Sequence, residues 1–174
     1  MIDLQNTINK SVTRSGIGLH TARLVDLTIH PAPANTGIVF RRTDLTGIDN
    51  TIPAHISNVA DVSLNTSICN NDGAVIGTIE HLMAAFAGLG IDNAYVDVYG
   101  HELPACDGSS LRFCDMLIEA EKTVQREERR YLKVTKPIFI KNGLSELSIT
   151  PANMLQLNVK IEFSDPFIGT SQYF

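Results

Sequence analysis

The residues of this chain best suited to chemistry are Glu80 and His81, which stand side by side in the segment GTIEHLMAAFAGLG. A neutral imidazole is a good zinc ligand, and a carboxylate beside a metal can take a proton from an attacking water. The same residue types also suit a first helical turn, where the helix dipole favours a glutamate and a histidine makes local hydrogen bonds. The pattern alone favours this structural role, because the H-E-x-x-H arrangement that supplies two ligands from one helix is absent.

A second group of reactive side chains lies in GHELPACDGSS, which holds His101, Glu102, Cys106 and Asp107. These types could offer mixed metal ligands. Their irregular spacing and the intervening proline favour instead a loop between a strand and a helix, with an acidic residue near the helix N-cap.

The glycine-rich segment SGIGLHT, residues 15–21, resembles a phosphate-binding loop only in composition. No helix pattern follows it, so we interpret it as a hairpin connection. His20, within this connection, is expected to be exposed and could face a ligand.

Two helices are expected to position these residues. In the first, Ile79, Leu82 and Phe86 share one apolar face, Thr78 is the expected N-cap, and GLG is the expected stop. The second is expected within residues 107–122, where apolar side chains recur at helical spacing.

The rest of the chain shows the alternation and turn signals of β-strands. Asn-Asp-Gly at residues 71–73 is the strongest hairpin signal, and the segments that follow the second helix again predict a β-meander. The expected fold is α+β, a mainly antiparallel sheet with two helices packed on one face, in a single domain over residues 1–174. The strand-forming segments are expected within residues 7–20, 22–32, 37–45, 51–59, 64–78, 93–100, 131–141, 144–150 and 155–163.

The composition is that of a folded globular protein, with 44% hydrophobic and 19% charged residues among 174. Nineteen acidic against 14 basic residues give a net charge of −5, which argues against a nucleic-acid surface, and the mixed run REERR at 126–130 is expected to be a solvated helix end. No apolar run approaches the roughly 20 residues that span a bilayer, and no secretory signal is apparent. Three cysteines without C-x-x-C spacing indicate reduced thiols and a cytoplasmic location.

Taken together, GIGLHT, HPAPANTGIVFRRTDL and TIEHLMAAFAGLGIDNAYVDVYGHELPACDGSS resemble the UDP-3-O-acyl-N-acetylglucosamine deacetylases, the zinc hydrolases that commit the bacterial lipid A pathway to lipopolysaccharide. The resemblance covers nearly all of residues 7–173. It implies removal of an acetyl group from the glucosamine nitrogen, with Glu80 as general base and His81 as a zinc ligand. It further implies substrate contacts from Leu19, His20, Ser63 and Asn65, and assigns Asp107 mainly to helix capping.

The resemblance also implies a second, similar domain that this sequence lacks. In the family that domain brings an H-x-x-x-D pair to the zinc, and no histidine follows His101 here. We therefore expect the first domain of a two-domain deacetylase, cut before its second half, with one zinc ligand, inactive alone and prone to self-association through the exposed interdomain face. The alternative is a non-catalytic α+β binding or scaffold module with an idle Glu-His pair, distinguished by whether the coding frame continues.

Overall fold

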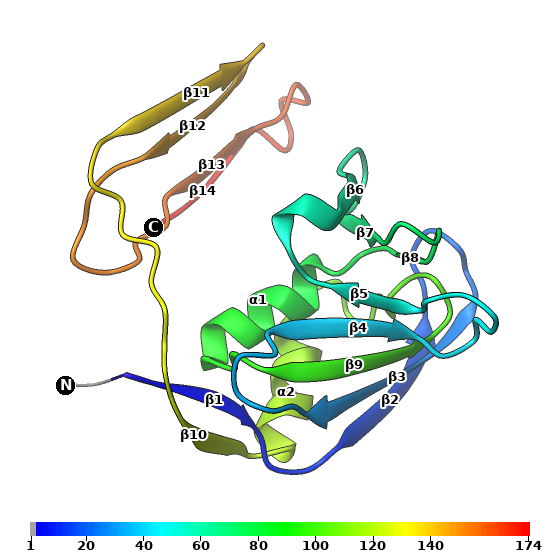
Figure 1. The fold of residues 1–174 in the computed structure, drawn as a ribbon. Helices are drawn as coiled ribbons and strands as arrows, with labels where there is room; N and C mark the ends of the chain where they lie inside the picture. Colours follow the sequence, from blue (N-terminus) through cyan, green and yellow to red (C-terminus); the bar gives the residue numbers. More distant parts are fainter. Residues whose placement is uncertain (1–2) are drawn as a thin grey trace. The chain divides into compact units, whose positions relative to one another are not determined.

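The computed structural model describes residues 3–174, which divide into two units with a boundary between Arg129 and Arg130 (Figure 1). The first unit contains both helices and all of the buried residues. In residues 130–174 every side chain is exposed or half-buried. The expectation of one domain over residues 1–174 therefore stays a prediction, and each unit is described separately below.

A five-stranded sheet forms the base of the first unit, in the order β2-β3-β9-β4-β5. Its pairs are antiparallel except β4 and β9, which run parallel with Phe40 opposite Val96. The predicted α+β class with a mainly antiparallel sheet is confirmed. The strands are β2 (Val12–Ile17), β3 (Leu24–Pro31), β9 (Ala94–Tyr99), β4 (Ile38–Arg42) and β5 (Thr51–Pro53).

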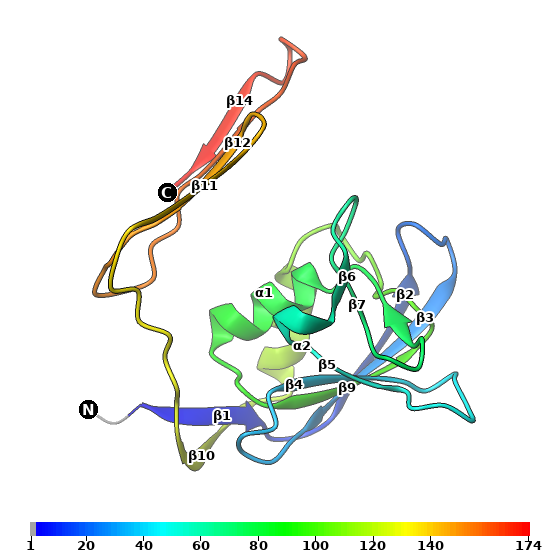
Figure 2. The same ribbon diagram turned by 45° about the horizontal axis from the view of Figure 1, so that its top comes forward.

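Both helices, α1 (Glu80–Leu89) and α2 (Leu111–Glu119), cover the same face of this sheet, as predicted (Figure 2). Because successive strand residues point to opposite faces, every second residue of β3 and β9 enters the core beneath the helices. The opposite face is polar: His30 contacts Asp97 at 3.1 Å, and Asp97 also binds Arg41. The strand residues buried in the core include Val25, Leu27, Ile29, Phe40, Ile52, Val96 and Val98.

Helix α1 begins without the predicted Thr78 cap. The N-cap residue is Ile79, and no side chain caps the helix. Thr78 instead has a left-handed φ of 58°, and its hydroxyl donates to the buried Glu102 carboxylate at 3.2 Å. The predicted core face of Ile79, Leu82 and Phe86 is buried as expected.

The C-terminus of α1 ends at Gly90, as the GLG pattern predicts, with a left-handed φ of 67°. Arg129 caps this end of the helix. Its Nη2 donates to the Gly90 carbonyl at 2.6 Å, and its Nε donates to Asp92 at 2.9 Å. A guanidinium at a helix C-terminus is favoured by the helix dipole. Arg129 therefore joins the last strand of the first unit to the helix that carries Glu80.

The prediction of a helix end at REERR is wrong. Helix α2 ends at Glu119, and Glu121 turns the chain with a left-handed φ of 58°. Residues Lys122–Glu128 then form β10, which pairs antiparallel with β1 (Leu4–Ile8). The β-branched Thr123 and Val124 suit this pairing, and the mixed charges stand along an exposed strand.

A small antiparallel sheet lies next to the start of α1 (Figure 2). It consists of β6 (Val59–Asp61), β7 (Ser67–Cys69) and β8 (Val75–Ile76), preceded by the short 3-10 helix Ile56–Asn58. The Asn-Asp-Gly segment joins β7 to β8 with Gly73 at a φ of 88°, so the predicted hairpin is confirmed. The loop between β6 and β7 carries Ser63 and Asn65.

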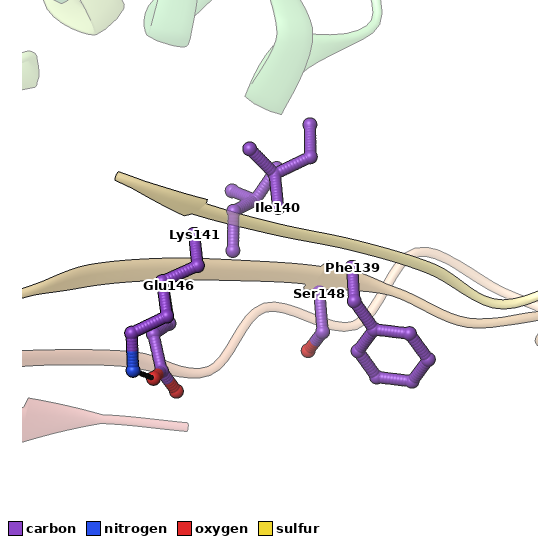
Figure 3. A pocket seen from close by; sticks show the side chains of 6 residues that line it. Phe139, Ile140, Lys141, Glu146 and Ser148 are labelled. Carbon is purple, nitrogen blue, oxygen red and sulfur yellow. Dashed lines mark hydrogen bonds and ion pairs between the residues drawn. The ribbon is translucent and has the colours of Figure 1, made fainter. Parts of the chain in front are cut away.

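The second unit consists of two hairpins, and neither has a core of its own. In the hairpin of β11 (Ile138–Asn142) and β12 (Ser145–Ile149), Lys141 and Glu146 pair on one side, with Phe139 and Ser148 beside them (Figure 3). The other side ends in the polar pair of Asn142 and Ser145 next to the turn and is otherwise apolar, with four side chains that are 41–57% exposed: Ile138, Ile140, Leu147 and Ile149. The second hairpin, β13 (Val159–Glu162) with β14 (Thr170–Tyr173), likewise places Val159 opposite Tyr173.

The described helices give no membrane-spanning candidate, since none in residues 3–174 is long and apolar enough to cross a bilayer. The cysteines Cys69, Cys106 and Cys114 are free thiols, as predicted.

Candidate active site

Glu80 is the first residue of α1, and the small sheet holds its carboxylate. The backbone N–H of Thr66 donates to Glu80 Oε2 at 3.0 Å, and the N–H of Ile79 donates back to the Thr66 carbonyl at 3.3 Å. The chain entering β7 is thereby fastened across the helix N-terminus, where the positive end of the dipole favours a carboxylate. This arrangement fixes Oε2 and leaves Oε1 as the oxygen that can accept a proton.

His81 follows in the same helical turn and is half-buried. The helix surface that continues from this turn carries only small residues, because Ala84, Ala87 and Gly88 are all exposed. A bulky group can therefore approach the first turn along this side of α1.

The described residues do not complete a metal site by themselves. Within residues 3–174 no three side chains of the histidine, cysteine, aspartate or glutamate types come together in a way that could hold a metal ion. His81 can supply one imidazole nitrogen, and a zinc site in proteins normally requires three or four ligands.

Three of the four predicted substrate contacts share one hollow of about 300 Å³ beside the start of α1. His20, Ser63 and Asn65 all line it. Leu19 lies in the same loop as His20 and is 66% exposed, but it is not part of the wall, and neither is Glu80 or His81. The full lining is His20, Thr21, Asp61, Ser63, Leu64, Asn65, Ser67, Val75, Gly77, His101 and Glu102.

Asn65 connects this hollow to the helix. Its Nδ2 donates to the Thr78 hydroxyl at 2.9 Å, and its Oδ1 accepts from the Ser67 hydroxyl at 2.9 Å. Ser63 is exposed and makes its hydrogen bonds with Asp61, whose Oδ1 accepts from the Ser63 hydroxyl at 2.8 Å. These bonds from Ser63 lower the pKa of Asp61, so that this wall of the hollow carries a carboxylate.

The buried carboxylate of Glu102 is the main feature of the site that the sequence did not reveal. Glu102 is 3% exposed, and its oxygens accept from the N–H of His20 at 2.9 Å and the N–H of Thr21 at 3.0 Å. Burial alone would raise the pKa of Glu102. The hydrogen bonds from the backbone of His20 and Thr21 and from the hydroxyls of Thr21 and Thr78 outweigh it and hold the pKa below its usual range.

The glycines of SGIGLHT are explained by this close approach. A Cβ on Gly18 would lie 2.5 Å from Glu102 Oε2, and a Cβ on Gly16 would lie 2.7 Å from the Pro104 side chain. Residues 15–17 of this segment end β2, and residues 18–21 begin the connection to β3, so the predicted hairpin connection holds for the second part of the segment, where His20 is exposed. Its glycines make room for residues 101–105.

The prediction that Asp107 caps α2 is wrong, because its carboxylate bonds to Ser109 in the loop before the helix and to no N–H of the first helical turn. Asp107 Oδ1 accepts from the N–H and the hydroxyl of Ser109, and Ser109 Oγ accepts from the N–H of Leu111 at 3.1 Å. The N-cap residue itself is Ser110, which makes no side-chain cap. His101, next to Glu102, is exposed and lines the hollow.

Comparisons with known proteins identify the family of this chain. A family model described as UDP-3-O-acyl N-acetylglycosamine deacetylase matches residues 5–174. Among curated relatives, the UDP-3-O-acyl-N-acetylglucosamine deacetylases of Vibrio vulnificus strain YJ016 and of Neisseria meningitidis serogroup C strain 053442 are each 40% identical over 169 residues. The enzyme of that name from Shewanella sp. strain W3-18-1 is 42% identical over 168 residues.

Each of these alignments covers 97% of this chain and 55% of the relative. The chain therefore spans about half the length of the curated relatives it matches. Since the family model extends over residues 5–174, the chain belongs to the UDP-3-O-acyl N-acetylglycosamine deacetylase family.

Proposed function

We propose that this chain supplies Glu80, His81 and the hollow of His20 to a zinc-dependent deacetylase that removes the N-acetyl group of UDP-3-O-acyl-N-acetylglucosamine. The observation that supports this most is the anchored Glu80 carboxylate, held by Thr66 beside the half-buried His81 at an accessible helix start. The names of the relatives supply the substrate and the reaction.

Glu80 acts as the general base in this proposal. With Oε2 held by the Thr66 N–H, Oε1 takes the proton of the water that attacks the amide carbonyl. His81 contributes one imidazole ligand to zinc, with the remaining ligands coming from outside the described residues. When bound, zinc would supply Lewis-acid polarisation of the amide carbonyl.

The hollow receives the part of the substrate next to the acetyl group. His20 and Ser63 present polar groups at its surface, and Asn65 keeps one N–H and one oxygen lone pair beyond the bonds it makes with Thr78 and Ser67. Leu19, 66% exposed beside His20, offers an apolar contact to the acyl chain.

The missing ligands define the partner in this proposal: the second half of the enzyme, which forms the other side of the site. The helix layer has exposed apolar side chains that such a partner can cover, with Leu111 58% and Ile118 65% exposed on α2. Without it, this surface would favour self-association. We place the reaction in lipid A biosynthesis in the cytoplasm, in keeping with three free thiols.

The test is acetate release from UDP-3-O-acyl-N-acetylglucosamine by the 174-residue chain mixed with the remaining portion of the Shewanella relative. The mixture is expected to release acetate, and Glu80→Gln to lower the rate by about 10²–10⁴-fold, because the general base is lost. Glu119→Gln, which removes an exposed carboxylate at the end of α2, is the matched control and should leave the rate unchanged.

Two results would contradict the proposal. Equal rates for Glu80→Gln and Glu119→Gln would remove Glu80 from the reaction. A mixture in which the two portions form a stable complex that binds substrate but releases no acetate would favour the non-catalytic scaffold with an idle Glu80-His81 pair.

A further inference from the structure

We propose that Glu102 is a positioning residue for the active site: its carboxylate fixes the loop of His20 against the start of α1. The inference rests on the proposed function, because it assigns a role to the hollow beside Glu80. Glu102 itself touches neither Glu80 nor His81 in the described contacts, and it acts through the residues that it holds.

The geometry is a convergence of donors on one buried carboxylate. Oε1 accepts from the His20 N–H at 2.9 Å and from the Thr78 hydroxyl at 3.2 Å, and Oε2 accepts from the Thr21 N–H at 3.0 Å. These donors come from two segments far apart in the sequence, and Glu102 belongs to a third. Hydrogen bonds to an ionised acceptor are about twice as strong as neutral ones, so the carboxylate is a strong fastening point.

The third segment runs between the other two. Backbone hydrogen bonds join the Gly77 N–H to the His101 carbonyl at 2.9 Å and the Leu103 N–H to the Gly77 carbonyl at 3.0 Å. On its other side, the Ala105 N–H donates to the Ile17 carbonyl at 2.9 Å. Glu102 therefore projects from a segment that is already fixed to both the loop and the approach to α1.

A series of hydrogen bonds links Glu102 to the proposed general base, Glu80. Thr78, held by Glu102, accepts from Asn65, and Thr66 next to Asn65 donates to Glu80. Thr78 also directly precedes Ile79, the N-cap of the helix that begins at Glu80. Displacing Glu102 should consequently move the His20 wall and loosen the Thr78 approach to the helix.

Glutamine cannot replace this carboxylate. An amide has one acceptor oxygen and an NH₂ group, whereas the four donors, two from Thr21 and one each from His20 and Thr78, are shared by two acceptor oxygens. In Glu102→Gln the NH₂ takes the place of one of the two oxygens. In the position of Oε1 it faces the His20 N–H and the Thr78 hydroxyl, and in the position of Oε2 it faces the Thr21 N–H. The variant keeps the size of the side chain, so it tests the charge and the acceptors rather than the packing.

The experiment is residue-resolved amide exchange on the full 174-residue chain, without substrate or zinc. In Glu102→Gln the amides of His20 and Thr21 are expected to exchange about 10–100-fold faster than in the wild type, from the loss of hydrogen bonds to a charged group. The control is Thr7→Val, which removes a buried β1 hydroxyl bonded to the Asn93 carbonyl at 2.7 Å. It should lower global stability and leave these two amides protected.

Measuring amide exchange at several pH values separates a specific role of the Glu102 carboxylate from a general loss of stability. In the wild type the protection of His20 and Thr21 should persist below the ordinary glutamate pKa of about 4.3 and disappear when Glu102 is protonated. In Glu102→Gln this acid step should be missing. The other titratable groups around the hollow are His20, His101 and Asp61, and Asp61→Asn should retain the step.

Unchanged exchange at His20 and Thr21 in Glu102→Gln would overturn the inference, and so would an equal loss of protection in Thr7→Val. In the mixed enzyme, Glu102→Gln should raise KM more than it lowers kcat, unlike Glu80→Gln, and an effect on kcat alone would also contradict it. Loss of the two amide protections, together with a wild-type mixture that forms a stable, substrate-binding complex but releases no acetate, would refute the proposed function and leave the role of Glu102 in holding the His20 loop intact.

Discussion

Replacing Gly18 by alanine tests the packing around Glu102 with a single methyl group. The backbone at Gly18 does not have a left-handed φ, so the conformation itself accepts a side chain. The new Cβ, however, would lie 2.5 Å from Glu102 Oε2 and 2.6 Å from the Thr21 hydroxyl oxygen. Both distances are far shorter than a carbon and an oxygen tolerate, so either the carboxylate or the loop must shift.

The expected cost follows from overpacking a filled site, which lowers the free energy of unfolding by about 1–3 kcal/mol. For a chain of this size that corresponds to a fall in Tm of roughly 2–12 °C. The displaced carboxylate also loses part of its bonds to the N–H groups of His20 and Thr21, which places Gly18→Ala toward the upper part of the range.

The assay is thermal unfolding followed by circular dichroism, with Gly88→Ala as the control. Gly88 lies in α1, and a Cβ at this position would meet no heavy atom within 4 Å, so Gly88→Ala should stabilise the protein by about 0.5–1 kcal/mol through better helix propensity. Opposite signs for the two glycine-to-alanine changes are expected. If Gly18→Ala unfolds at the wild-type temperature, the close approach of Glu102 to this loop is wrong.

Further predictions concern the core, the helix end, acid stability and association. Phe86→Ala, at a side chain 1% exposed, should lower the free energy of unfolding by about 3–5 kcal/mol in chemical denaturation. Arg129→Ala should cost about 1–3 kcal/mol in the same measurement, and Arg129→Lys should not restore the paired bonds to Asp92 and the Gly90 carbonyl. Because the folded-state pKa of Glu102 is lowered, the stability difference between wild type and Glu102→Gln should stay constant above the ordinary glutamate pKa and shrink progressively as pH falls from there through the folded-state pKa, as urea titrations at several pH values would show. Ile118→Glu should reduce any self-association of the chain in sedimentation velocity, since this 65% exposed side chain stands on the helix layer.

The fold could be predicted largely because its local signals agree with its tertiary contacts. The apolar spacing of Ile79, Leu82 and Phe86 gives the buried face of α1, and Gly90 marks its end. Strand β10 escaped prediction because its charged side chains are exposed and its partner β1 lies more than 100 residues earlier. The charged residues 126–128 belong to a strand because β10 pairs with β1, and no local pattern predicts this pairing.

In the site, too, the residues in local motifs could be predicted and those that depend on distant contacts could not. Motif resemblance led to Glu80, His81 and the loop of His20, and the structure places His20, Ser63 and Asn65 around one hollow. Glu102 was visible only as one member of an irregular cluster. Its burial and its four donors depend on residues about 24 and 80 positions away, which no local pattern encodes. The local sequence likewise predicted Thr78 as a helix cap, because it does not show that the Thr78 hydroxyl donates to the distant Glu102 instead.

The central claim, that this chain carries His81 as one ligand of a shared zinc site, is tested most directly by zinc content. Elemental analysis of the tag-free chain, dialysed against metal-free buffer, should give well below one zinc per chain. About one zinc per complex is expected after mixing with the remaining portion of the Shewanella relative, and His81→Ala should abolish it. About one zinc per isolated chain, lost in His81→Ala, would contradict the account, because the further ligands would then lie within this chain or in a second copy.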